Sequence, residues 1–95
     1  MNRYRLSHQA ELDLEDIWAY LAEKDNLAAD LMVAKILNKF PMLAQFPDMG
    51  YERADLTVPM RSFPVKPYVA FYRRTDIGIE IFRVLHQSRD IEQQL

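Results

Sequence analysis

Apolar residues in the first part of the chain recur every three or four positions, the spacing with which a helix buries one side. One such stripe consists of Ala10, Leu14, Ile17 and Leu21. It predicts a helix from about His8 to Lys24, with Ser7 as the N-cap, where a serine hydroxyl accepts a hydrogen bond from the first turn. Trp18 adjoins the stripe, and we expect it in the core.

A second helical stripe follows the break at Asp25-Asn26, and it consists of Val33, Leu37, Phe40 and Ala44. Pro41 lies inside this stripe. Because proline lacks an N–H group and its ring clashes with the preceding turn, we expect a kink or a break near Leu37–Phe40. The short connection makes the two helices antiparallel neighbours, an α-hairpin. The run Phe46–Gly50 ends the helical part.

From about Leu56 the apolar period changes to two, the period of a β-strand. The clearest strand is Tyr68–Tyr72, which is rich in aromatic and β-branched residues. Its expected partner is Ile79–Leu85, after a loop over Arg74–Gly78 in which Gly78 is available for a positive φ.

Three weaker segments complete the predicted fold. Tyr4–Leu6 is a short opening strand, and Ser88–Leu95 has the composition of a short C-terminal helix. Val58–Val65 contains Pro59 and Pro64, which cannot donate to a ladder, so this strand is expected at an edge or with a bulge. The fold class is α+β: an N-terminal α-hairpin packed on a twisted antiparallel sheet of three to four strands, with a short C-terminal helix.

Both central strands are apolar on both faces. Val69 and Phe71 are expected on the face opposite to Tyr68, Ala70 and Tyr72. In the partner strand, Ile79 and Ile81 are expected opposite to Phe82 and Val84. The helical hairpin covers only one face of the sheet. The other face needs the C-terminal segment or another chain to cover it, since a contiguous exposed apolar face is costly in a free monomer.

Length and composition narrow the function classes. The 95 residues fit one domain, 1–95, and the 49% hydrophobic and 27% charged residues are typical of a packed globular protein. The absence of cysteine excludes disulfides and thiolate metal sites. No apolar run approaches the ~18 residues of a membrane span. We expect a cytoplasmic domain with no cofactor, no metal and no membrane partner.

The net charge of −2 hides an uneven distribution. Residues 53–89 contain seven basic and three acidic residues, which favours an anionic partner on that side of the fold. Enzyme signatures are weak, because the chain has two glycines and no phosphate-binding loop. The expected binding residues all lie in this strand-rich part and are Arg61, Tyr68, Tyr72, Arg73, Arg83, His86 and Arg89.

Several stretches, in this order along the chain, resemble the RelE/ParE superfamily of toxin–antitoxin toxins. They are Tyr4–Ser7, Ala10–Trp18, Leu43–Gly50, Met60–Val65, Tyr68–Arg73 and Phe82–Ile91. The resemblance implies the α-hairpin on a twisted sheet that the periodicities also predict. It leaves a choice between RelE-like ribosome-dependent mRNA endonucleases and ParE-like inhibitors of DNA gyrase.

The residues of this chain favour the ParE branch. RelE-like chains commonly carry basic residues at the positions of Pro64, Val69 and Gln87, and a tyrosine near Ile91. Phosphodiester cleavage needs cations facing the developing charge, which these residues do not provide. A pI of about 5.6 also suits ribosome binding poorly, because that binding gains from counterion release.

The resemblance therefore implies a binding toxin with no catalytic residue and no sequence-specific contact to nucleic acid. DNA gyrase is the expected target, and a ParD-type antitoxin is the expected partner in a toxin–antitoxin hetero-oligomer. The alternatives are a RelE-like nuclease that uses Arg61, Arg83 and His86, or a non-toxic relative that only binds its antitoxin. Arg83 also has a structural interpretation, an intrachain pair with a carboxylate such as Glu80 or Asp90.

Overall fold

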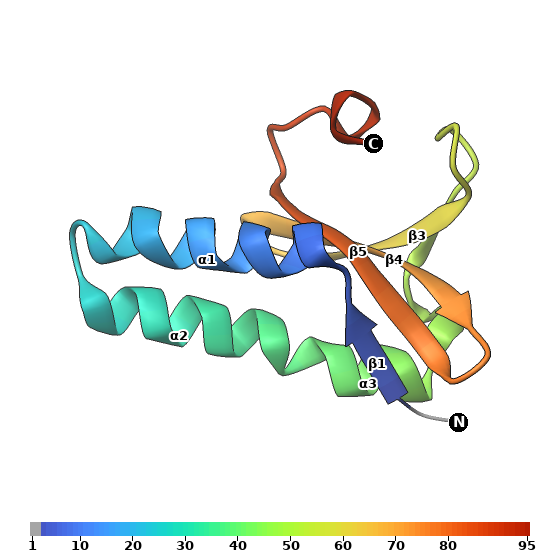
Figure 1. Cartoon of the computed structure of the whole chain (residues 1–95), viewed down its shortest axis with the longest axis horizontal. Coiled ribbons are helices and arrows are strands. Elements are labelled where there is room, and N and C mark those ends of the chain that lie inside the picture. The colour runs from blue at the N-terminus through green and yellow to red at the C-terminus, as the bar shows by residue number, and fades with distance from the viewer. Residues whose placement is uncertain (1–2) are drawn as a thin grey trace.

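Three helices cover one face of a five-stranded sheet in the computed structural model, which describes residues 3–95 (Figure 1). The helices are α1 (His8–Ala22), α2 (Asn26–Leu37) and α3 (Lys39–Gln45). The strands are β1 (Arg3–Leu6), β2 (Tyr51–Arg53), β3 (Met60–Val65), β4 (Tyr68–Thr75) and β5 (Gly78–His86), and the 3-10 helices are η1 (Pro47–Met49) and η2 (Ile91–Gln94). Among residues 3–95, no helix combines the length and apolar character that a membrane crossing requires.

The predicted ends of the helices are confirmed with small shifts. The Ser7 hydroxyl caps α1 by accepting from the Ala10 N–H (3.0 Å), and it donates to the Phe82 carbonyl (2.7 Å), which ties the start of α1 to β5. Asp25 caps α2 in the same way by accepting from the Leu27 N–H (2.9 Å). The expected break before Pro41 lies at Asn38, between α2 and α3.

The sheet has the order β1-β5-β4-β3-β2, one strand more than expected. It is mixed, because β1 pairs parallel to β5 while the other pairs are antiparallel. β1 lies so close to the start of β5 that a Cβ atom on Gly78 would clash with the Arg3 carbonyl oxygen. Gly78 also has a φ of +148°, as its place in the predicted loop suggested. β4 continues through Thr75, so the loop is shorter than predicted.

The sheet has a different apolar cluster on each face. The larger cluster lies between the helices and the sheet and includes Phe40, Tyr72 and Ile81. The smaller cluster, on the opposite face, consists of Leu56, Met60, Phe71, Leu85 and Ile91. The C-terminal turn lies on the side of the sheet away from the helices (Figure 1). The sequence left open whether the C-terminal segment or another chain covers this face. In the structure, the chain's own C-terminal segment lies over it.

A bulge changes the side-chain directions along β5. Phe71 pairs with Arg83 and the next residue, Tyr72, pairs with Ile81, so Phe82 has no direct partner in β4. As a result, Val84 packs in the helix-side cluster with Ile81, while Phe82 packs on the other face. The expected grouping of Val84 with Phe82 was therefore wrong, because strict alternation takes no account of an inserted residue.

Candidate functional site

The structure distributes the seven predicted binding residues over three places. Arg61, Tyr72 and Arg73 lie along the middle of the sheet, Tyr68, His86 and Arg89 lie near the C-terminal end of β5, and Arg83 lies beneath the C-terminal segment. They do not form one continuous patch.

Arg61 and Tyr72 hold the turn that follows α3. The Arg61 guanidinium donates to the Gly50 carbonyl (2.8 Å) and lies 3.6 Å from the Asp48 carboxylate. The Tyr72 hydroxyl accepts from the Gly50 N–H (2.8 Å) and donates to the Pro47 carbonyl (2.7 Å). Burial raises the pKa of Tyr72, so its hydroxyl stays protonated for this contact. The Tyr72 side chain is fully buried, and its role in the chain is structural.

Arg83 forms a bidentate ion pair with Asp13 of α1, at 2.8 Å and 2.9 Å. The two side chains are only 11% and 9% exposed. The Asp13 carboxylate also accepts from the Val84 N–H (2.9 Å), and its hydrogen bond to the guanidinium raises the pKa of Arg83. An intrachain partner for Arg83 was weighed from the sequence, but the expected carboxylates were wrong. Glu80 instead pairs with Arg5 (3.0 Å) and Arg73 (3.1 Å).

His86, Tyr68 and Arg89 mark the end of the central strands. Tyr68 and His86 are cross-strand partners, and their rings meet edge to face with centroids 5.6 Å apart. The Nδ1 atom of His86 lies 2.9 Å from the Ser88 hydroxyl. Tyr68 is buried, whereas His86 and Arg89 are exposed. This end of the sheet therefore presents an imidazole and a guanidinium to a partner.

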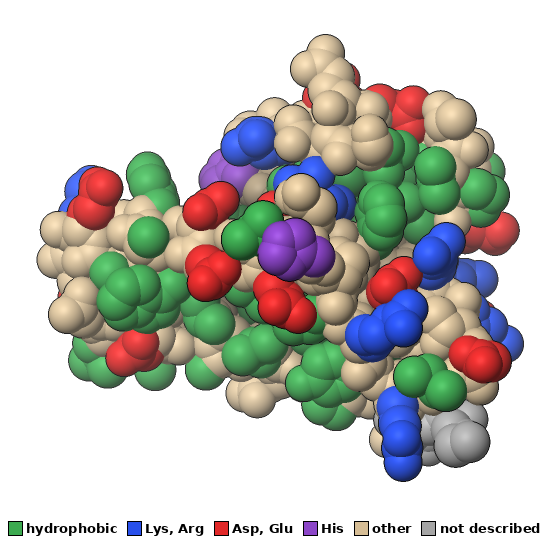
Figure 2. All heavy atoms as spheres, viewed as in Figure 1, with side chains coloured by type: hydrophobic (Ala, Val, Ile, Leu, Met, Phe, Trp, Pro, Cys, Tyr) green, Lys and Arg blue, Asp and Glu red, His purple; other side chains and the backbone are tan. Residues whose placement is uncertain are grey.

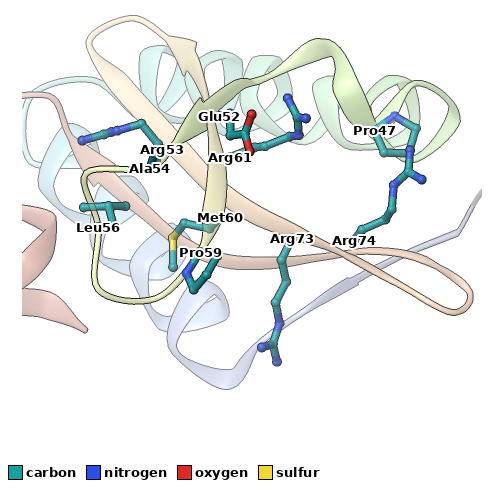
Figure 3. A pocket seen from close by; sticks show the side chains of 10 residues that line it. All are labelled: Pro47, Glu52, Arg53, Ala54, Leu56, Pro59, Met60, Arg61, Arg73 and Arg74. Atoms are coloured by element: carbon teal, nitrogen blue, oxygen red, sulfur yellow. The ribbon is translucent and has the colours of Figure 1, made fainter.

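A hollow of about 250 Å³ lies beside β2, β3 and β4 (Figure 3). Its lining includes Arg53, Arg61, Arg73 and Arg74 above an apolar floor that contains Met60 and Leu56. Arg61 and Arg74 both reach the Asp48 carboxylate, at 3.6 Å and 3.2 Å, whereas Arg53 and Arg73 point in other directions (Figure 3). Such a rim fits an extended anionic segment better than a single compact anion.

Each of these arginines already has a carboxylate nearby. Arg53 makes two 2.9 Å contacts with Asp55, and this hydrogen bond raises the pKa of Arg53 and lowers that of Asp55. Arg74 pairs with Asp48 at 3.2 Å. Exposed pairs of this kind contribute little to stability and leave guanidinium donors available, so a partner's carboxylates can share or replace them.

A second concavity, about 450 Å³ in volume, lies along α1 and α2. We call it the hairpin groove; its lining consists of Leu6, Glu11, Leu14, Glu15, Trp18, Val33 and Leu37. Trp18 is 40% exposed, and its Nε1 donates to the Asp30 carboxylate across the hairpin (2.7 Å). The expectation of Trp18 in the core was therefore wrong. The stripe residues Leu14 and Ile17 are buried, and the neighbouring indole faces the groove instead.

The hairpin is the acidic part of the molecule. Residues 7–37 contain seven acidic and two basic residues. In the view of Figure 2, acidic and apolar side chains alternate over α1 and α2, and basic side chains gather toward the β1 end. Two candidate surfaces of opposite charge character are thus present, the hairpin groove and the arginine-lined hollow.

Sequence reasoning missed Asp13 and the hairpin groove. The spacing of Asp13 was an available signal, because it lies three residues after Ala10 and four before Ile17 and therefore on the buried side of α1. The groove had no comparable signal, since its walls come from three separate elements. Within residues 3–95, no group of three or more histidine, cysteine or acidic residues is arranged to hold a metal ion.

The chain is similar to toxins of one family along nearly its whole length. Residues 4–91 match the model for the ParE toxin of the type II toxin-antitoxin system parDE. Toxin ParE1 of Caulobacter vibrioides is 35% identical over 96 positions, covering 100% of this chain and 99% of that protein. Toxin ParE1 of Mycobacterium tuberculosis is 28% identical over 96 positions, covering 99% of this chain and 98% of that protein.

The fold has a counterpart among solved structures. A chain described as the chromosomal ParDE TA system from P. aeruginosa superposes with a TM-score of 0.77 and 22% identity, covering 90% of this chain and 96% of that one. At this identity the likeness concerns the fold alone. It agrees with the predicted α-hairpin on a sheet.

Proposed function

Since the chain belongs to the ParE family of toxins of type II toxin–antitoxin systems, we propose that it inhibits DNA gyrase by binding and that a ParD-type antitoxin neutralises it. The observation that carries this proposal is the family match over residues 4–91. We further propose that residues 1–95 act in the cytoplasm as one toxin domain, in a hetero-oligomer with the antitoxin.

The antitoxin is proposed to use both candidate surfaces. The hairpin groove has the apolar walls that an amphipathic helix needs, with the exposed Trp18 and the half-buried Val33 and Leu37 accessible to such a helix. The arginine-lined hollow suits an acidic extended segment that follows the helix. Arg61, Arg73, His86 and Arg89 are the predicted binding residues with exposed or partly exposed polar groups.

The arrangement of the arginines supports binding over cleavage. Arg61 and Arg83 would serve a reduced nuclease site with His86, yet Arg61 holds the carbonyl of Gly50 and Arg83 is paired with Asp13. Arg83, a cation engaged inside the fold, is not available to stabilise a developing charge on a phosphate. The binding mode therefore requires less rearrangement of this chain.

The target is tested with purified toxin in a gyrase supercoiling assay. We expect supercoiling to stop, or cleaved DNA to accumulate, when toxin and gyrase are equimolar. Toxin preincubated with its antitoxin is the control and should leave gyrase active. Normal supercoiling in a large excess of active toxin would refute gyrase as the target.

The other two interpretations have separate readouts. Cuts in ribosome-bound mRNA, detected by primer extension and lost in His86→Ala, would establish the nuclease instead. Normal growth after induction without antitoxin would establish the non-toxic relative.

Antitoxin binding at the hairpin groove is tested with the chain's single tryptophan, Trp18. A helix that covers the indole should shift its emission to shorter wavelength, because water is removed from the ring. Trp18→Ala, measured by calorimetry, should weaken antitoxin binding at least tenfold, whereas Leu27→Ala, at an exposed side chain of the same hairpin outside the groove, is the matched control. Equal loss in both variants would place the antitoxin elsewhere on the hairpin.

A further inference from the structure

The C-terminal strap, residues 90–95, is held to the sheet by a small set of contacts. Of its residues, all of which the structure describes, Ile91 alone is buried, at 5% exposure. The strap pairs with no strand, and it ends the chain as the short 3-10 helix η2. The position of the strap therefore depends on the apolar contacts that the sheet face makes with Ile91 and on a few hydrogen bonds to polar groups of the strap.

The receiving surface consists of three subsites. An apolar slot formed by Leu56, Met60, Phe71 and Leu85 takes the Ile91 side chain. The backbone N–H and hydroxyl of Thr57 donate to the two oxygens of Glu92, at 2.9 Å and 2.8 Å. The Nη1 atom of Arg83 donates to the Gln94 carbonyl at 2.7 Å.

These subsites are built by parts of the fold other than the strap. The Asp13 carboxylate binds the Nε and Nη2 atoms of Arg83, which leaves the Nη1 atom of Arg83 directed at the strap. Thr57 belongs to the connection between β2 and β3, whose Leu56 and Met60 are buried in the slot. A surface whose donors are oriented in advance loses less entropy when it binds a segment.

We propose that this surface is a peptide-binding site, which the strap occupies in the isolated chain and a partner's extended segment can occupy in its place. The strap itself defines the ligand chemistry. The partner segment carries an aliphatic residue, then a glutamate, and then a backbone carbonyl two residues further on, matching Ile91, Glu92 and Gln94. The site is defined by this chain's own residues, so it does not depend on the proposed target.

The covalent link gives the strap an advantage over any separate peptide. A tethered segment competes at an effective concentration of roughly millimolar, whereas a free peptide competes at its actual concentration. A partner that also binds a second surface of the chain regains this advantage by the same tethering. The site therefore serves as one of two contact points for a bivalent partner, rather than as a receptor for short free peptides.

The test uses the full chain with a weakened strap, Ile91→Ala together with Glu92→Gln. The probe is a fluorescein-labelled synthetic peptide with the sequence of residues 88–95, followed by fluorescence anisotropy. We expect saturable binding to this variant at least tenfold tighter than to the unmodified chain, whose own strap occupies the site. Undetectable binding to the folded variant, or equal binding to both chains, would overturn the proposal.

Matched peptides test the chemistry of each subsite. Replacing the peptide's isoleucine by alanine, or its glutamate by glutamine, should reduce affinity at least tenfold, whereas Gln93→Ala, which alters an exposed side chain, should change it less than twofold. Thr57→Val in the protein removes the hydroxyl donor but keeps the backbone N–H, so it should reduce the preference for glutamate over glutamine. Equal affinity for all four peptides would overturn the proposed specificity.

If the peptide does not bind the double variant, the cause must be identified: either the variant is unfolded or the proposed site is absent. Circular dichroism establishes whether the double variant is folded. If it is not, Glu92→Gln alone carries the same test, since it alters only the exposed carboxylate that accepts two hydrogen bonds from Thr57 and leaves Ile91 in the slot. Binding of the peptide to Glu92→Gln should then exceed binding to the unmodified chain at least threefold, and equal binding would overturn the proposal.

Discussion

The two faces of the sheet are both apolar in sequence but are covered in different ways. The helix side buries fourteen residues beneath three regular helices, whereas the strap side buries five beneath the connection between β2 and β3 and the C-terminal strap. Because stabilisation scales with the apolar area removed from water, the helix side contributes most of the stability. The strap side is the part of the fold that can open locally. In this protein, a second apolar face provides an interaction surface more than a second core.

The largest expected effect is on the helix side. Phe40→Ala removes a fully buried ring from the larger cluster and should destabilise the chain by about 3–5 kcal/mol, measured by urea unfolding. Tyr20→Ala, at a 70% exposed ring, is the control and should change stability by no more than about 0.5 kcal/mol. If Phe40→Ala loses no more stability than Tyr20→Ala, the helices repack around the missing ring, and the two faces differ less in stability than proposed.

The ion pair that crosses between α1 and the strap side comes next. Asp13→Asn leaves the Arg83 guanidinium without its charge partner in a place where both side chains are nearly buried. Breaking such a pair costs about 3 kcal/mol or more. Urea unfolding measures this loss, with exposed Glu15→Gln as the control on the same helix.

The same pair allows a second measurement. Adding Arg83→Met to Asp13→Asn should recover part of the lost stability, because the unpaired charge is then gone. If the double variant is less stable than Asp13→Asn, the cost lies in lost hydrogen bonds to the strap and to Val84 rather than in the uncompensated charge.

A smaller effect is expected on the strap side. Ile91→Ala removes the strap's buried side chain, but the segment is free to collapse onto the slot. We expect a loss of about 2 kcal/mol, the low end for such a truncation. Urea unfolding of this variant beside Phe40→Ala compares the two faces directly. Equal losses would contradict the difference between them.

Tyr72→Phe tests the polar contact on the helix side. It leaves the Gly50 N–H and the Pro47 carbonyl without the hydroxyl that now binds both. An unmade buried hydrogen bond of this kind costs about 1–2 kcal/mol. Faster amide exchange of Gly50 in the variant should accompany the loss. Unchanged exchange would show that water replaces the hydroxyl.

The smallest effect is a pH dependence of the strap. The N–H and hydroxyl of Thr57 donate to the Glu92 carboxylate and hold its pKa below the ordinary glutamate range. The strap contact is therefore complete above the unfolded pKa of about 4.3 and is lost as the pH falls through the lowered value. The NMR shift of the Thr57 amide should follow this titration. Glu92→Gln should remove the titration, and a titration that persists would have another origin.

The features that could be predicted from the sequence are those that depend on contacts between residues close together in the chain. The stripes, the Ser7 cap and the break before Pro41 depend on neighbours within a turn or two, and each is present as predicted. The order of motifs along the chain likewise indicated the family. Of the four arginines that line the hollow, Arg61 and Arg73 were identified as binding residues, but Arg53 and Arg74 were not. Their arrangement in space was not predicted either, since it depends on the register of strands that are separate in sequence.

The sequence by itself determined the hairpin, the central strands, the uneven charge and the presence of two apolar faces. The tertiary structure decided which residues meet: Asp13 with Arg83 across 70 positions, and Thr57 with Glu92 across 35. It also decided the parallel pairing of β1 and the bulge at Phe82, which directs Val84 to the helices. Helix periods and caps are set by short-range contacts, whereas strand register and buried ion pairs exist only after distant segments have packed together.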